Sequence, residues 1–204
     1  MAQIKHRYTG KKYLEAASFK FKHKDYFNLK YLYELMHEWF IEEGYAPRED
    51  PLFPETFYMH RETQTIGNEI WIYWRMTKKP IKDSKFWKYD LDMDMHVVGL
   101  KDAELMHEGQ KYKAQWGEPE IKIWAKLVFD YEGWSKSKLL APLFEVFQKR
   151  IVKKTMEAHK KELYREAYRF QESMKSYFKL STHLPEREMQ AFYETKTPGE
   201  QTKP

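Results

Sequence analysis

The segment from Phe86 to Met106 constrains the fold more than any other part of the chain, because apolar and polar residues alternate along it. Its apolar positions are Tyr89, Leu91, Met93, Met95 and Val97. The polar positions between them are Asp90, Asp92, Asp94 and His96. A period of two places successive side chains on opposite faces of a β-strand, whereas a helix would mix the two sets. The segment therefore predicts a long strand with one face on a core and the other face wetter.

Further strands are predicted on both sides of this segment. Patterns typical of strands occur at 18–24, 56–62, 69–77, 111–116 and 121–131. Because the later strands follow one another through short connections, we expect an antiparallel meander of about four to five strands. Gly99 interrupts the alternation of the long strand and predicts a β-bulge. Gly117-Glu118-Pro119 is expected to separate the last two strands.

A helix is predicted at about 26–43, between the strand pattern at 18–24 and the later strands. Asp25 can cap its start, and Gly44 is a natural stop. The proline-rich segment 45–54 is expected to be a loop. Spacings of three and four produce one apolar face, formed by Leu29, Leu32, Leu35, Met36, Trp39 and Phe40.

A long helix is predicted over 138–180, with two apolar stripes that do not align. The first stripe consists of Leu140, Phe144, Phe147 and Ile151. The second consists of Leu163, Ala167, Phe170, Met174 and Tyr177. The second lies about 120° round the helix from the first, so the helix either breaks near 152–162 or changes partner halfway, with its second half protruding. An apolar stripe of this size needs a partner. We therefore expect a homo-oligomer, or packing against the N-terminal helix, through Leu163, Phe170, Met174 and Tyr177.

The expected fold class is α+β, with an N-terminal helix, an antiparallel meander and a long C-terminal helix. Residues 1–180 are expected to form a single domain, in which 1–17 is a basic arm, and 181–204 a polar, flexible tail. Cysteine is absent, which excludes disulfides and thiol chemistry. No apolar run is long enough for a membrane span and no secretory signal is visible, so a cytoplasmic location is expected.

Positive charge is concentrated in two segments. Residues 1–25 and residues 149–165 each carry seven lysines and arginines against two acids, while the whole chain has a net charge of +5. This segregation suggests an acidic partner, such as a nucleic acid or an acidic protein surface. The alternative is that the basic segments neutralise the acidic remainder of the chain. The predicted polyanion-binding residues are Lys11, Lys12, Lys20, Lys22, Arg150, Lys154, Lys161 and Arg165.

The clearest motif for metal chemistry is the acidic face of the long strand, from Asp90 to His96. Its carboxylates could together bind a cation such as Mg²⁺. Alternatively, Lys122, Lys126 or Arg75 on neighbouring strands could neutralise their charge. We favour this second interpretation. Glu34-x-x-His37 has the spacing of carboxylate-bridged metal sites, but it lies opposite the apolar face of its helix. Phosphate-binding loops and nucleophile motifs are missing. No catalytic residue, cofactor or metal ligand is therefore predicted.

Three functional hypotheses follow. The first is a non-enzymatic binding or assembly protein that engages an acidic partner and self-associates through its C-terminal helix. The second rests on element order, which is similar to that of helix-grip folds, where a curved sheet wraps a helix around a hydrophobic ligand. An aromatic content of 17% and ten methionines suit such a cavity. The third is a metal-assisted enzyme built on the Asp90–His96 face.

Overall fold

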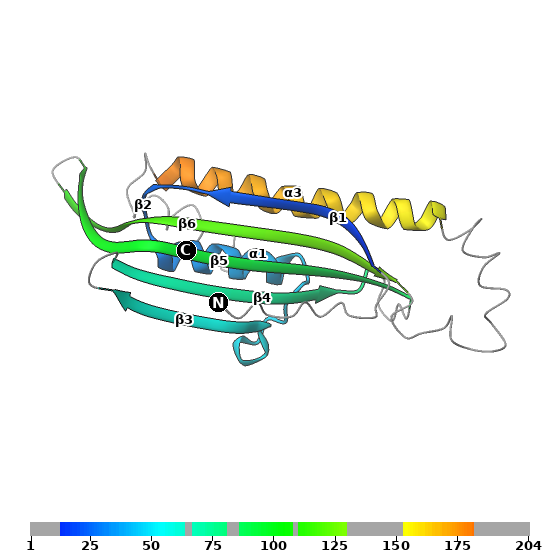
Figure 1. Cartoon of the computed structure of the whole chain (residues 1–204). Helices are drawn as coiled ribbons and strands as arrows, with labels where there is room; N and C mark the ends of the chain where they lie inside the picture. Colours follow the sequence, from blue (N-terminus) through cyan, green and yellow to red (C-terminus); the bar gives the residue numbers. More distant parts are fainter. Residues whose placement is uncertain (1–12, 64–66, 81–85, 108–109, 130–152, 182–204) are drawn as a thin grey trace, which may run out of the picture.

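The computed structural model describes residues 13–63, 67–80, 86–107, 110–129 and 153–181. An antiparallel six-stranded sheet has the order β1-β6-β5-β4-β3, and the short β2 also pairs with β6. The strands are β1 (Tyr13–Lys22), β2 (Asp25–Phe27), β3 (Glu55–Thr63), β4 (Gly67–Lys78), β5 (Trp87–His107) and β6 (Gln110–Phe129). Helices α1 (Leu29–Glu42) and α3 (Lys153–Ser181) pack on one face, and η1 (Asp50–Leu52) is a single 3₁₀ turn (Figure 1). The α+β class, the antiparallel sheet and both terminal helices are confirmed.

The alternation along β5 sorts its residues onto two faces as expected. Leu91 lies opposite Met76 on β4 and Ala125 on β6, and all three are buried beneath the helices. We call this helix-covered side the inner face and the opposite side the outer face. Asp90 and Asp92 lie on the outer face, and they too are buried, at 0% and 2% exposure. The expectation of a wetter outer face is therefore wrong at these two positions.

The predicted break at Gly117-Glu118-Pro119 is absent, because β6 continues through it. Irregularities on both neighbouring strands meet this point. On one side the register of β5 shifts between Val98 and Lys101. On the other side β1 ends and β2 begins, and the His23 amide donates to the Pro119 carbonyl at 3.1 Å. A proline and a glycine are tolerated within a strand where the ladder is already interrupted.

The start of the N-terminal helix also differs from the prediction. Asp25 belongs to strand β2, and Asn28 is the cap, with its side-chain oxygen accepting from the Tyr31 amide at 3.1 Å. The helix ends where Gly44 adopts a φ of 76°, as the sequence predicted. Residues 13–17 of the predicted basic arm belong to strand β1, where Tyr13 pairs with Val128 on β6, and the rest of that arm lies outside the described residues.

Helix α3 lies along β1 and β6 and contacts α1 (Figure 1). It is continuous from Lys153, so the predicted break does not occur in the described part of the helix. The first apolar stripe, from Leu140 to Ile151, and the tail 182–204 lie outside the described residues. No helix of the described ranges combines the length and apolarity that crossing a membrane would need.

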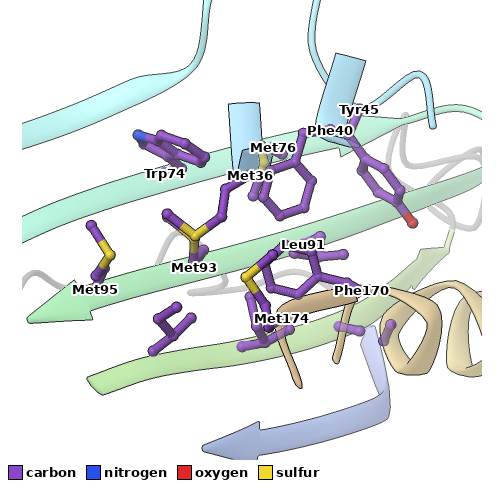
Figure 2. Packing of buried hydrophobic residues seen from close by; sticks show 14 of the residues in the cluster. Met36, Phe40, Tyr45, Trp74, Met76, Leu91, Met93, Met95, Phe170 and Met174 are labelled. Carbon is purple, nitrogen blue, oxygen red and sulfur yellow. The ribbon is translucent and has the colours of Figure 1, made fainter. Parts of the chain in front are cut away.

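The core lies between the inner face of the sheet and the two helices. Phe170 of α3 stacks on Phe40 of α1 at 4.9 Å and meets Trp39 edge-on at 5.0 Å. Methionines from α1, α3 and the central strands fill the space around these rings (Figure 2). Their unbranched side chains adapt to irregular gaps between large rings. This aromatic and methionine-rich core joins α1, α3 and the sheet into one unit.

Candidate functional site

A groove of about 1320 Å³ lies beside α1. One wall is the exposed side of α1, and the floor comes from β3 and β4. The other wall is the distal part of the β5–β6 hairpin, at residues 102–104 and 113–115. This hairpin extends past the other strands and curls (Figure 1). We refer to this hollow as the groove.

Local sequence explains why these walls face one another. Leu32, Met36 and Phe40 point α1 into the core, so Tyr33 and His37, one position further along, face the groove. On the opposite wall, the predicted bulge at Gly99 has formed, with a φ of 67°. A bulge inserts one residue and so exchanges the faces of a strand. Even-numbered residues of β5 face outward before Gly99, whereas Leu100 lies in the core and Asp102 lines the groove.

An aromatic cluster built around a carboxylate forms the floor of the groove, and all of its members except Trp74 line the groove. Glu55 Oε2 accepts a hydrogen bond from the Trp74 indole at 2.8 Å and one from the Tyr33 hydroxyl at 3.1 Å. Phe53 meets Trp74 edge-on at 4.7 Å and stacks on His37 at 4.1 Å. Trp74 is fully buried, whereas the other four side chains are half-buried. This arrangement holds the carboxylate and the rings in fixed positions.

Acidic side chains outnumber basic ones around the groove. The acids are Glu34, Glu38, Glu55, Asp102 and Glu104, and the cations are Lys30 and Lys113. Glu34 lies 3.8 Å from Lys30, and Glu104 lies 3.0 Å from Lys111. The remaining carboxylates have no lysine or arginine partner among the described residues. The local charge is therefore negative, although the chain as a whole is positive.

The groups of the groove that could take part in chemistry include carboxylates, tyrosines and one histidine. Serine, threonine and cysteine are missing from the described residues that line it. Glu34 and His37, the pair with metal-site spacing, both line it. Within the described ranges, however, no three histidine or carboxylate side chains are placed to hold a metal ion.

The acidic face of β5 forms ion pairs across the sheet. Arg75 lies 2.6 Å from Asp94, and Lys126 lies 3.6 Å from Asp92. Asp90 accepts from Thr77 at 2.9 Å and lies 3.1 Å from Lys88. Lys126 and Arg75 thus offset the acids as the sequence suggested. Lys122 instead lies 2.8 Å from Glu120.

The predicted polyanion-binding residues fall on separate surfaces. Lys20 and Lys22 lie on the outer side of β1, where they pair with Glu120 at 2.7 Å and Glu118 at 3.0 Å. Hydrogen bonds from Lys122 and then Lys20 lower the pKa of Glu120 to about 2. Residues Lys154, Lys161 and Arg165 are exposed on α3. Residues Lys11, Lys12 and Arg150 lie outside the described residues.

The predicted self-association stripe is buried within the single chain. Leu163, Phe170, Met174 and Tyr177 are each at most 1% exposed. They pack on the sheet and on α1, which is the second of the two outcomes expected for this stripe. The Tyr177 hydroxyl also donates to the Asn28 carbonyl at 2.7 Å, beside the start of α1. Self-association stays a prediction, and it now requires a surface other than this stripe.

A second polar cluster, which no sequence pattern predicted, lies between α3, β4 and the segment that follows α1. Glu166 is 4% exposed and accepts from Lys78 and from the Tyr45 hydroxyl, each at 2.6 Å. Burial, and then the charge of Glu166, raise the pKa of Tyr45 well above its usual value. These contacts span chain separations of 88 and 121 residues, which no local pattern records.

The part of α3 that precedes Glu166 carries a related cluster. The Tyr89 hydroxyl lies 2.8 Å from both His159 Nδ1 and Glu162 Oε2. Burial, and then the hydrogen bond to Glu162, raise the pKa of Tyr89. Burial lowers the pKa of His159, with Glu162 opposing it. This cluster links the start of α3 to β5.

The sequence did not single out the groove residues. Tyr33 belonged to no predicted site, and Phe53 lay in a predicted loop. Glu55 preceded the predicted strand by one residue. A usable signal was the side of the N-terminal helix next to its apolar face, where Tyr33 and His37 are one turn apart.

Comparison with known proteins adds no assignment, because no protein-family model, curated protein or solved structure matches the chain.

Proposed function

We propose that this protein is a non-enzymatic binding protein that takes an organic ligand into the groove. The observation that carries this proposal is the groove itself, about 1320 Å³ in volume and bounded by a helix, a sheet and a curled hairpin. Ligand pockets for small molecules usually measure about 300–1,000 Å³ and combine apolar walls with a few placed polar groups. The aromatic floor, with Glu55 fixed by Tyr33 and Trp74, supplies both elements.

The arrangement of the elements supports the same proposal. A helix-grip protein holds its ligand between a curved sheet and a helix, and here α1 borders the groove on the inner face. The likeness is one of architecture alone, so the weight rests on the groove. The core beneath the groove is filled by large side chains, so we expect the ligand to lie beside α1 rather than beneath it.

The test is a fluorescence titration with the neutral apolar probe N-phenyl-1-naphthylamine. Saturable binding to one site is expected. Ala114→Trp fills the groove from the hairpin wall and should weaken binding by about tenfold or more. Ala158→Trp makes the same change on the exposed side of α3 and should have no effect. Absence of saturable binding, or equal loss in both folded variants, would refute the proposal.

A polyanion-binding surface on α3 is a second candidate function. Lys154, Lys161 and Arg165 are exposed at spacings of seven and four, and none has an ion-pair partner among the described residues. That spacing lines the cations along one side of the helix, where they could follow a phosphate backbone.

This candidate is tested by fluorescence anisotropy with labelled single-stranded RNA and duplex DNA. Affinity should fall steeply between about 50 and 300 mM salt, with little dependence on base sequence. Lys154→Glu combined with Lys161→Glu should abolish it. Binding that survives this double change, or no binding at low salt, would refute it.

A further inference from the structure

We infer that the ligand of the groove is an organic ammonium, whose charged end binds at Glu55 while its apolar body lies along the aromatic floor. This inference rests on the proposed function, because it names the class of ligand for the same groove.

The hydrogen bonding of Glu55 is the first step. Its carboxylate receives two protein hydrogen bonds, both on Oε2 and both from neutral donors. Oε1 accepts none from the described residues, and no lysine or arginine of those residues pairs with Glu55. Glu55 is half-buried, and a partly desolvated carboxylate is normally paired with a positive charge. Because Glu55 lines the groove, a cationic group of a ligand could complete this pair.

The rings around Glu55 are the second step. Tyr33 and Phe53 line the groove, and both meet the fully buried Trp74 edge-on, at 5.2 and 4.7 Å, although Trp74 itself does not line it. The Tyr58 side chain is 55% exposed and lines the same groove from β3. The faces of such rings attract cations, and quaternary and primary ammonium groups bind in aromatic surroundings of this kind. A carboxylate beside aromatic faces therefore selects a positively charged group with an apolar body.

The charge of the surrounding walls is the third step. Glu38 and Asp102 add negative charge from opposite walls, and Glu38 has no cationic partner among the described residues. This acidic surface is set in a protein of net charge +5. The field in the groove thus favours cations and repels anions. A hard divalent cation fits less well, because the neighbours of Glu55 are rings rather than further oxygen ligands.

The experiment compares three probes that share one apolar body. These are 4-phenylbutylamine, 4-phenylbutan-1-ol and 4-phenylbutanoate, titrated into the full chain by calorimetry at neutral pH. The amine should bind about tenfold more tightly than the alcohol, equivalent to about 1.4 kcal/mol, and the carboxylate should bind most weakly. Ala114→Trp should weaken the binding of all three.

The decisive variant is Glu55→Gln, which keeps an oxygen acceptor for Tyr33 and Trp74 but removes the charge. It should abolish the preference for the amine and leave the affinity for the alcohol unchanged. Glu62→Gln is the matched control, because it makes the same substitution on the same strand outside the groove. It should leave the preference for the amine intact.

The outcomes separate this inference from the proposed function. Equal binding of amine and alcohol, or an unchanged preference in Glu55→Gln, would overturn the ammonium inference and leave the groove as a binding site. A loss of affinity for all three probes in Glu55→Gln would also overturn it, because it would show a role in shaping the floor. Failure of every probe, including the neutral naphthylamine, would refute both.

Discussion

Replacing Lys78 by methionine should show how much the ion pair between Lys78 and Glu166 contributes to the stability of the fold. The substitution keeps the aliphatic stem but removes the ammonium 2.6 Å from the carboxylate. Glu166 then remains almost fully buried, with only the Tyr45 hydroxyl donating to it. Removing one partner of a buried pair typically costs about 3–5 kcal/mol. The Lys78 side chain is itself 22% exposed, so water can reach the place that the ammonium leaves. We therefore expect the free energy of unfolding to fall by about 2–3 kcal/mol.

The assay is urea unfolding followed by circular dichroism, with the free energy of unfolding as the readout. Lys79→Met is the matched control, because Lys79 is exposed and should change stability by less than about 0.5 kcal/mol. Adding Glu166→Leu to Lys78→Met should recover much of the loss, since no buried charge is then left unpaired. A loss below about 1 kcal/mol in Lys78→Met, or further destabilisation in the double variant, would contradict this reasoning.

Three further predictions concern pH and backbone geometry. The pKa of Glu120 is lowered from 4.5 to about 2, so its contribution to stability is fully present above pH 4.5 and is lost as the pH falls through about 2. After allowance for screening, Glu120→Gln should lower the free energy of unfolding in urea by about 1 kcal/mol at neutral pH and by much less near pH 2. The pKa of His159 is lowered by burial, so the unfolded chain binds more protons below about pH 6.5 and stability should fall there. His159→Gln should flatten that fall when urea midpoints at about pH 7.5 and 5.5 are compared, and an unchanged slope would contradict the assignment. Gly99→Ala forces a side chain onto a φ of 67° and should cost about 1–2 kcal/mol, measured by thermal unfolding against Gly117→Ala, whose backbone lies outside the left-handed region.

The sequence predicts most of the sheet because alternation is a local property. Met93 and Met95 are buried, with Asp94 between them on the outer face, and the pattern itself specifies this. The bulge at Gly99 was predictable for the same reason, since glycine marks the place where the alternation breaks. The error at Pro119 arose because a proline in a strand is acceptable only when its neighbours are also irregular, which the sequence does not show.

The groove could not be predicted, because it depends on contacts between distant segments. Glu55 meets Tyr33 across 22 residues and Trp74 across 19, and neither pairing follows from a period. The hairpin wall faces the groove only because one inserted residue exchanges the faces of β5. Likewise, the sequence left two partners open for the apolar stripe of α3, another copy of the chain or the N-terminal helix, and the contact between Phe170 and Phe40 shows the second.

The pairing of β1 with β6 has a consequence for folding during synthesis. Tyr13 pairs with Val128, so the first strand finds its partner only after more than half of the chain has been made. At ribosomal speeds of about 5–20 residues per second, β1 waits roughly 5–20 seconds. Throughout that interval Phe19 and Phe21 have no sheet to cover them. The lysines between and after them act as gatekeepers, because a strand that alternates charge with phenylalanine resists joining a neighbouring nascent chain.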